Sequence, residues 1–263
     1  MPSSPDMQPP ATDSSRPSDS DASRAGAPEI PHLATPKLVL FDVDYTILEP
    51  GEMFGPEGYR AVGERYDLAL DLSRWHEAER AAYATVKRRR EELGVAHDGG
   101  AYMAIADAVI EALGGGPPDA VAACARAIVG EWVRVENFGL YDDVAPCFER
   151  LRAAGLRLGL VSNTSRDLDE IVAAFALAGQ VEVVVASVEI GLAKPSPAIF
   201  GAALERAGVA APDAVMVGDS VEDDVKGALA CGMGAVLIDR SGRYDLPLPT
   251  IRTLADLPAA LSL

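Results

Sequence analysis

The sequence has few of the residues that form disulfide frameworks or zinc sites. Its 263 residues include three cysteines and three histidines. Cys124, Cys147 and Cys231 are widely spaced and form no CxxC pair, which is typical of unpaired thiols in a reducing compartment. The histidines also lack the spacing of a metal-ligand set. The sequence therefore predicts neither a disulfide framework nor a zinc site.

Long apolar runs and basic residues are scarce as well. No run reaches the ~18–20 apolar residues that span a bilayer, and the first residues lack the apolar core of a secretory signal. The chain carries 23 Lys and Arg against 40 Asp and Glu, a net charge of −17, whereas a nucleic-acid binder needs a basic face. We expect a cytoplasmic protein that binds no membrane and no nucleic acid.

Residues 1–36 differ in composition from the rest of the chain. They hold 8 of the 19 prolines and seven serines, with almost no aliphatic periodicity. Such a segment cannot bury enough apolar surface to offset the entropy lost when it is ordered. We expect a disordered N-terminal tail with no catalytic role.

After this tail, short apolar runs alternate with segments of helical periodicity. The runs have the length and composition of buried parallel strands, and they cover 38–41, 156–161, 181–186, 214–217 and 235–238. The segments of helical periodicity cover 142–154, 165–177, 195–207 and 221–231. This alternation implies βαβ crossovers. The sequence therefore predicts an α/β fold with a Rossmann-like, doubly wound parallel sheet.

Residues 52–138 interrupt the alternation. Apolar residues recur there at helical spacing in three series, within 72–93, 102–113 and 121–135. Gly and Pro residues at 114–118 separate the second series from the third. We expect an all-helical insertion, 52–138, in a core formed by residues 37–51 and 139–263.

Four polar segments stand out against this framework. They are the acidic turn 42–46 (DVDYT), the pair 162–163 (SN), Lys194 before Pro195, and the cluster 218–224 (GDSVEDD). Asp42, Ser162 and Asp219 each follow or close an apolar run. Ligand sites of doubly wound sheets lie at the carboxyl ends of the strands. We therefore expect these three residues to share one site.

The residue types in these segments suit the transfer of a phosphoryl group. Asp42 and Asp44 are two residues apart, so at an extended strand end both can face one pocket. One carboxylate can attack phosphorus while the other exchanges protons with the leaving oxygen and with water. Taken singly, each segment has an ordinary alternative. A DxD pair is often a surface loop, a Ser-Asn pair a turn, and a Lys-Pro pair a solvated loop.

Together, in this order and spacing, the four segments resemble the motifs of the haloacid dehalogenase-like (HAD) hydrolase superfamily. The resemblance covers roughly Lys37 to Leu263. It implies that the helical insertion is a C1-type cap over the active site, as in subfamily I. It also implies that Asp42 is the nucleophile, that Asp44 is the general acid and base, and that the reaction passes through an aspartyl-phosphate.

The resemblance further implies a Mg²⁺ site. Its expected ligands are the Asp42 and Asp219 side chains, the Asp44 carbonyl and a second acid of the cluster. The GDxxxxD spacing selects Asp224, whereas the GDxxxD spacing selects Asp223 as the rival; we prefer Asp224.

For the substrate phosphate, the resemblance implies Ser162 as a donor, with Thr46 and Asn163 in support. Lys194 is expected to shield both the nucleophile and the phosphate. Tyr45 stands where the family often has Gly. It either narrows the mouth of the pocket or contacts the substrate through its hydroxyl, and we prefer the steric role.

These observations favour a Mg²⁺-dependent phosphatase that acts on a small phosphorylated metabolite. Asp44 argues against a dehalogenase, because cleavage of a carbon–halogen bond needs no acid at the leaving group. The alternatives are a phosphomutase of the same fold and a catalytically silent binding protein. The basic run 87–90 is either a second anion site or a solvated helix face. The protein is expected to be a monomer or a homodimer.

Overall fold

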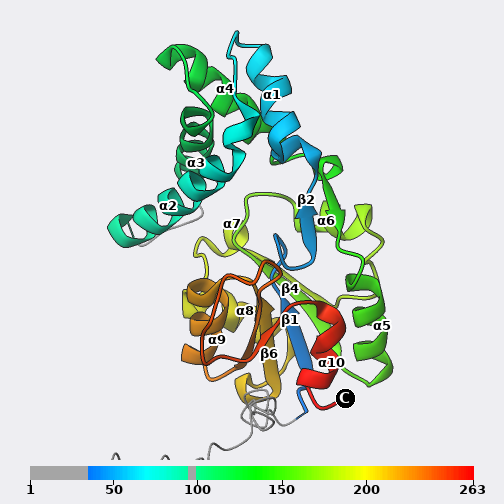
Figure 1. Cartoon of the computed structure of the whole chain (residues 1–263). Coiled ribbons are helices and arrows are strands. Elements are labelled where there is room, and N and C mark those ends of the chain that lie inside the picture. Colours follow the sequence, from blue (N-terminus) through cyan, green and yellow to red (C-terminus); the bar gives the residue numbers. More distant parts are fainter. Residues whose placement is uncertain (1–34, 94–98) are drawn as a thin grey trace, which may run out of the picture.

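The computed structural model describes residues 35–93 and 99–263, and within them it contains a six-stranded parallel sheet (Figure 1). The strand order is β5-β4-β1-β6-β7-β8. The strands are β1 (Leu38–Phe41), β4 (Arg157–Ser162), β5 (Val183–Ala186), β6 (Ala214–Gly218), β7 (Gly234–Ile238) and β8 (Thr250–Ile251). The first five coincide with the predicted apolar runs, so the predicted doubly wound α/β sheet is confirmed. Of the predicted disordered tail, 1–36, residues 1–34 lie outside the described residues.

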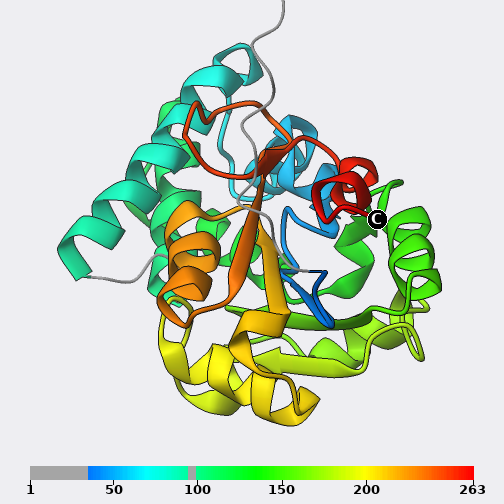
Figure 2. The ribbon, with the colours of Figure 1, turned by 90° about the horizontal axis from the view of Figure 1, so that it is seen from below.

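Helices cover both faces of the sheet. The side chains of β1 alternate between two apolar clusters: Val39 and Phe41 join one, while Leu38 and Leu40 join the other. The first cluster includes residues from α5 (Val144–Ala153), α6 (Leu168–Ala174) and α10 (Leu257–Ala260). The second includes residues from α8 (Pro197–Ala207) and α9 (Gly227–Ala230). Figure 2 shows α5 and α10 on one side of the strands and the yellow and orange helices on the other. The buried strand β1 therefore holds its carboxyl end rigidly.

Four α-helices of the described residues lie between residues 52 and 138 and pack around an apolar core of their own. They are α1 (Pro56–Glu64), α2 (Trp75–Leu93), α3 (Gly99–Ala112) and α4 (Pro118–Glu131). The three helical series of the sequence correspond to α2, α3 and α4. The short helix α1 was not predicted; it begins at Pro56, which suits the first position of a helix. This helical insertion lies above the sheet in Figure 1.

A small antiparallel ribbon joins the helical insertion to the core. It pairs β2 (Leu48–Pro50) with β3 (Phe138–Leu140), so the outgoing and returning chains lie side by side. The short helix η1 (Glu52–Phe54) follows β2, and η3 (Val135–Asn137) precedes β3. At three residues each, these strands are too short for periodicity to reveal.

Two of the predicted helices begin later or less regularly than expected. Helix α6 begins at Leu168 because Asp167 caps it, accepting hydrogen bonds from the amides of Asp169 and Glu170. The predicted helix 221–231 consists of a π-helical segment, η5 (Val221–Lys226), followed by α9. The remaining short elements are η2 (Leu72–Arg74), α7 (Ser187–Ile190), η4 (Ala211–Asp213) and η6 (Leu254–Asp256).

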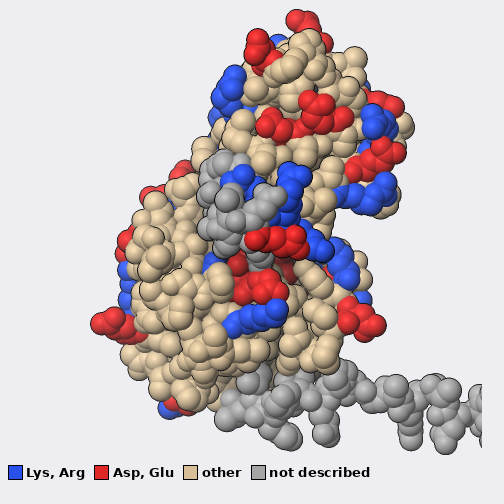
Figure 3. All heavy atoms as spheres, turned by 90° about the vertical axis from the view of Figure 1, so that its left-hand side faces the viewer, with Lys and Arg blue, Asp and Glu red and all other residues tan. Residues whose placement is uncertain are grey.

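The surface carries its charges unevenly. Figure 3 shows Lys and Arg side chains gathered at the level where the helical insertion meets the core, whereas Asp and Glu are spread over both parts. Lys87, in the basic run of α2, is exposed, and its Nζ lies 4.0 Å from Oε1 of Glu91. This placement is typical of a solvated helix face. Among the described helices, none is both long and apolar enough to cross a membrane.

Candidate active site

The turn after β1 sends its two aspartates in different directions. Asp42 extends the sheet, because its amide donates to the carbonyl of Val217 at 2.9 Å. The chain then folds back, and the amides of Ile47 and Leu48 both donate to the carbonyl of Val43 at 3.0 and 2.9 Å. Asp42 is therefore fixed by the sheet, while Asp44 belongs to a tight turn.

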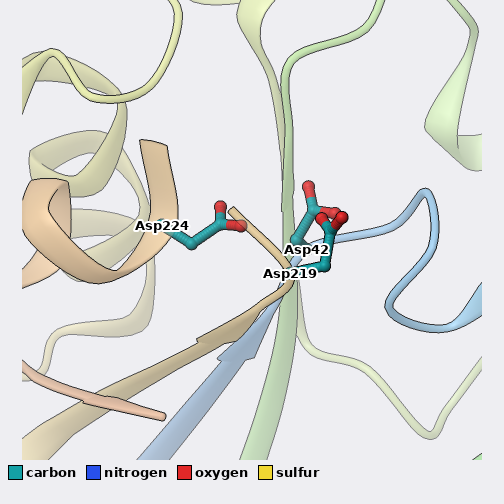
Figure 4. A group of neighbouring side chains, drawn as sticks. All are labelled: Asp42, Asp219 and Asp224. Atoms are coloured by element: carbon teal, nitrogen blue, oxygen red, sulfur yellow. The ribbon is translucent and has the colours of Figure 1, made fainter. Parts of the chain in front are cut away.

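Asp42, Asp219 and Asp224 form a compact carboxylate cluster at the carboxyl ends of β1 and β6 (Figure 4). One oxygen of each carboxylate lies within 4.8 Å of the others. Gly218 permits this arrangement, because a Cβ at that position would lie 2.2 Å from Asp224 Oδ2. Asp223 points elsewhere and accepts a hydrogen bond from Ser220 Oγ at 3.2 Å. The structure thus brings Asp224, rather than its rival, into the cluster.

Lys194 contacts two members of the carboxylate cluster, Asp42 and Asp224. Its Nζ donates to Asp42 Oδ1 at 2.5 Å, to Asp224 Oδ1 at 2.7 Å and to the carbonyl of Val161 at 2.9 Å. Lys194 is buried, so all three ammonium protons have partners inside the protein. This geometry places one cation between two carboxylates at the end of β1.

The placement of Asn163 differs from its expected role as a phosphate donor. Its side-chain amide donates to the carbonyl of Lys194 at 2.9 Å, and its Oδ1 accepts from the amide of Lys194 at 2.6 Å. Both polar atoms of the side chain are therefore engaged with the main chain. In this arrangement Asn163 fixes the loop that carries Lys194 instead of facing a phosphate.

The cluster carries more negative charge than its one cation balances. Burial raises the pKa of Asp42 to about 7, although Lys194 acts in the opposite direction. Burial and the charges of Asp42 and Asp224 raise the pKa of Asp219 well above its usual range. Burial disfavours the Lys194 cation, but Asp224 and Asp42 outweigh that effect and raise its pKa. A further cation would therefore fit this site.

Asp44 lies outside the cluster and is paired with Arg166, a residue that sequence analysis missed. Both oxygens of Asp44 accept from Arg166 Nη2, and the guanidinium lies 4.6 Å from the centroid of the Phe138 ring and 5.9 Å from that of Trp132. The side chain of Arg166 is only 3% exposed. The available clue was a cation four residues after Ser162, in the loop at the carboxyl end of a strand.

A second arginine, Arg240, forms a hydrogen bond with the turn that follows Asp42. Arg240 Nη2 donates to the carbonyl of Thr46 at 2.8 Å, while its guanidinium binds both oxygens of Asp143 at 2.8 and 2.9 Å. Thr46 is fully buried, and its Oγ1 has no hydrogen-bond partner in the part of the chain that the structure describes. Ser162 closes β4 and is buried at the same edge of the sheet. Arg240 was also missed by sequence analysis.

Tyr45 occupies the outer end of the turn. Its φ of 60° lies in the left-handed region, where a residue other than Gly costs roughly 1 kcal/mol. Its side chain is exposed, and its ring centroid lies 6.4 Å from that of Trp132, which follows α4. The conformation explains why Gly suits this position, and the aromatic contact reaches from the turn to the helical insertion.

Known proteins are similar to this chain in sequence and in fold. The family profile of haloacid dehalogenase-like hydrolases matches residues 36–232. A phosphoserine phosphatase of Thermus thermophilus is 31% identical over 80% of this chain and 92% of its own length. A glyceraldehyde 3-phosphate phosphatase of Methanopyrus kandleri is 30% identical over 80% of this chain and 86% of its own length. The crystal structure of a HAD phosphatase from Thermococcus onnurineus, 28% identical, covers 86% of this chain and 97% of its own with a TM-score of 0.56.

The fold and these matches define a hydrolase with a Rossmann-like parallel sheet. The chain belongs to the haloacid dehalogenase-like hydrolase family, as the motifs in its sequence indicated.

Proposed function

We propose that the protein is a Mg²⁺-dependent phosphatase that hydrolyses a phosphate monoester of a small metabolite through an aspartyl-phosphate on Asp42. The observation that carries the proposal is the shared ammonium of Lys194, which contacts Asp42 and Asp224 at the carboxyl end of β1. The phosphatase names of the two relatives support the choice of phosphate esters among the hydrolytic reactions.

In the first half-reaction, a carboxylate oxygen of Asp42 attacks phosphorus, and the bond from phosphorus to the leaving oxygen breaks. Asp44 gives its proton to that oxygen, so the alcohol leaves neutral. In the second half-reaction, Asp44 takes a proton from water as the water oxygen attacks phosphorus. Inorganic phosphate leaves, and the Asp42 carboxylate is restored. Both proton transfers use the carboxyl group of Asp44, which Arg166 holds in the structure.

The carboxylate cluster suits a hard divalent cation. The Asp42, Asp219 and Asp224 side chains, with the Asp44 carbonyl, would supply the oxygen ligands that Mg²⁺ prefers. The raised pKa values of Asp42 and Asp219 support this fit, because a cation would offset the surplus negative charge. When bound, Mg²⁺ shields the phosphate dianion from the carboxylates and withdraws charge from its oxygens.

Three side chains are proposed to donate hydrogen bonds to the phosphoryl oxygens. Ser162 ends β4 beside Asp42, and Lys194 already contacts the nucleophile. Thr46 Oγ1, which has no described partner, would add a donor from the turn. Asn163 contributes indirectly, since its side chain holds the main chain of Lys194.

The helical insertion is proposed to act as a cap that shelters the transferred phosphoryl group from bulk water. Trp132, at the end of α4, contacts Tyr45 of the turn and Arg166 of the core. The insertion therefore contacts Arg166, the residue that holds Asp44. We also propose that the enzyme is cytoplasmic.

The test is phosphate release from a panel of phosphate monoesters, with and without Mg²⁺. We expect hydrolysis that needs the metal, falls by roughly 10⁴-fold or more in Asp42→Asn, and is unchanged in Asp245→Asn, which alters an exposed aspartate of the loop after β7. An Asp42→Asn protein that keeps substantial metal-dependent activity would contradict the proposed nucleophile. A folded native protein that hydrolyses none of the esters would contradict the proposed function.

A further inference from the structure

A cavity of about 360 Å³ lies between the helical insertion and the core. Trp132 and Val133 line it from the end of α4, and Val188 and Leu192 line it from α7 and the loop that follows. Val133, Val188 and Leu192 are 57%, 61% and 52% exposed. The cavity therefore has an aromatic wall and an open apolar rim, which a bound molecule would cover.

This cavity adjoins the phosphate-binding end of the proposed site. Its lining includes Asn163 and Ala193, which are the chain neighbours of Ser162 and Lys194. The side chain of Asn163 is also bonded to the Lys194 main chain, so the site and the cavity share a wall. An ester whose phosphate meets Lys194 can extend its alcohol part into this space.

Among the described residues that line the cavity, none is Asp, Glu, Lys or Arg. Its polar groups are amides and hydroxyls, such as those of Asn163, Ser165 and Ser187. Arg166, the chain neighbour of the lining residue Ser165, is buried and paired with Asp44. Arg243 lies 4.6 Å from the ring of Tyr83 on α2. A carboxylate or second phosphate placed in the cavity would lose part of its water without gaining a cation, which is unfavourable.

We propose that this cavity binds the leaving group of the substrate, and that this group is uncharged with an apolar or aromatic face. The substrate class is then a monophosphate of a neutral alcohol or phenol, rather than a phosphate ester that carries a second anionic group. Trp132 offers a ring on which a planar group can stack, and the hydroxyls and amides serve a neutral polar substituent. The inference rests on the proposed phosphatase activity.

The experiment compares two esters that differ by one charge, phenyl phosphate and 4-carboxyphenyl phosphate, in the presence of Mg²⁺. We expect kcat/KM to be roughly tenfold or more higher for phenyl phosphate, because the added carboxylate finds no cation. A higher or equal kcat/KM for the carboxylated ester would overturn the inference and leave the phosphatase activity standing. Hydrolysis of neither ester, nor of any other monoester, would instead overturn the proposed function.

A pair of matched variants tests whether the discrimination between the two esters arises in this cavity. Leu192→Lys places a cation in the lining, and Leu229→Lys places one on α9; the two leucines are almost equally exposed, at 52% and 51%. Leu192→Lys is expected to shift the ratio of kcat/KM values towards the carboxylated ester by roughly threefold or more, whereas Leu229→Lys leaves the ratio unchanged. Equal shifts in both variants, or none in Leu192→Lys, would show that the leaving group does not occupy this cavity.

Discussion

At the scale of single residues, Lys194 shows how neighbours decide the state of a buried group. Burial alone would favour the neutral amine, yet Asp42 and Asp224 hold the proton on Nζ and raise its pKa. The same ammonium lowers the pKa of Asp42 against the effect of burial. The three side chains therefore act as a unit, and a change in one alters the charge of the others.

Arg166 is predicted to act through Asp44. Arg166→Met removes the partner that orients this carboxylate, so kcat should fall by roughly 10–100-fold for an alkyl phosphate, whose leaving group needs a proton. The loss should be much smaller for p-nitrophenyl phosphate, whose leaving group is stable as an anion. Steady-state kinetics with both esters measures the difference.

Arg157→Met is the matched control for this variant. Arg157 begins β4, the strand that precedes Arg166, and its Nε lies 2.6 Å from Glu182 Oε2, far from the carboxyl end of the strand. The Arg157→Met variant should change the rates for both esters equally or not at all. If Arg166→Met slowed both esters to the same extent, its role would be general support of the fold, and the account of Asp44 would fail.

Several residues of the site could be anticipated from sequence because strand ends are easy to locate. Apolar runs stop at Asp42, Ser162 and Asp219, and a parallel sheet gathers such ends at one edge. The contacts of Asn163 and Arg166 depend instead on loop geometry and on rotamers, which spacing does not encode. For the same reason, the sequence did not reveal the left-handed backbone conformation of Tyr45.

At the scale of elements, the junction from β6 to η5 depends on the missing side chain of Gly218. Gly218→Ala would place a Cβ against Asp224 Oδ2, so the carboxylate must move out of the cluster. Activity should fall by roughly 100-fold or more, with weaker Mg²⁺ affinity, while the fold persists. Kinetics as a function of Mg²⁺ concentration measures both changes.

Gly201→Ala controls for the added methyl group. Gly201 lies within α8, and a Cβ there meets no atom within 4 Å. This variant should keep full activity and gain up to about 1 kcal/mol of stability from the better helix propensity of Ala. Full activity in Gly218→Ala would show that the position of Asp224 is not critical.

Asp143 connects elements that are distant in sequence. At the start of α5 it accepts hydrogen bonds from Arg240, from Thr253 Oγ1 at 2.6 Å and from the amide of Leu254 at 2.9 Å. Burial would raise its pKa, but these donors outweigh that effect and lower it. Its contribution to stability is therefore present above the unfolded-state pKa of about 4 and is lost as the pH falls through the folded-state pKa.

Asp143→Asn should accordingly reduce the free energy of unfolding by about 1–2 kcal/mol at neutral pH. The difference from the native chain should shrink when the pH is lowered below about 4. Urea unfolding at several pH values provides the measurement. A difference that stays constant down to pH values where the carboxyl is protonated would contradict this assignment.

Which elements could be predicted depended mainly on their length. The four-residue strand β1 is fully apolar, and the long helix α2 repeats its periodicity, so both were found. Strands β2, β3 and β8 have two or three residues, too few for a period to be measured. The late start of α6 followed from the cap at Asp167 rather than from apolar spacing.

At the scale of the whole molecule, the surplus negative charge of the site links stability to pH and to Mg²⁺. The folded-state pKa of Asp42, about 7, lies above the unfolded-state value, so the folded state binds more protons between these values. In EDTA, the free energy of unfolding should therefore fall by about 1 kcal/mol or more as the pH rises from about 4 to about 7. Mg²⁺ should restore stability in that range.

Asp42→Asn removes the titrating group and should flatten this dependence in EDTA. Its stability should also respond less to Mg²⁺, since one ligand is lost. Thermal unfolding of both proteins, with and without the metal, gives the comparison. If Mg²⁺ raised the melting temperature of the two proteins equally, Asp42 would not be a ligand.

The central claim, an aspartyl-phosphate on Asp42, is tested most directly by trapping. The enzyme is mixed with substrate and Mg²⁺, quenched in acid during turnover and reduced with borohydride, which converts an aspartyl-phosphate into homoserine. Peptide mapping by mass spectrometry then locates the change. We predict homoserine at residue 42, and none in a sample without substrate. Turnover with no modified peptide, or with the modification at another carboxylate such as Asp44 or Asp219, would contradict the account.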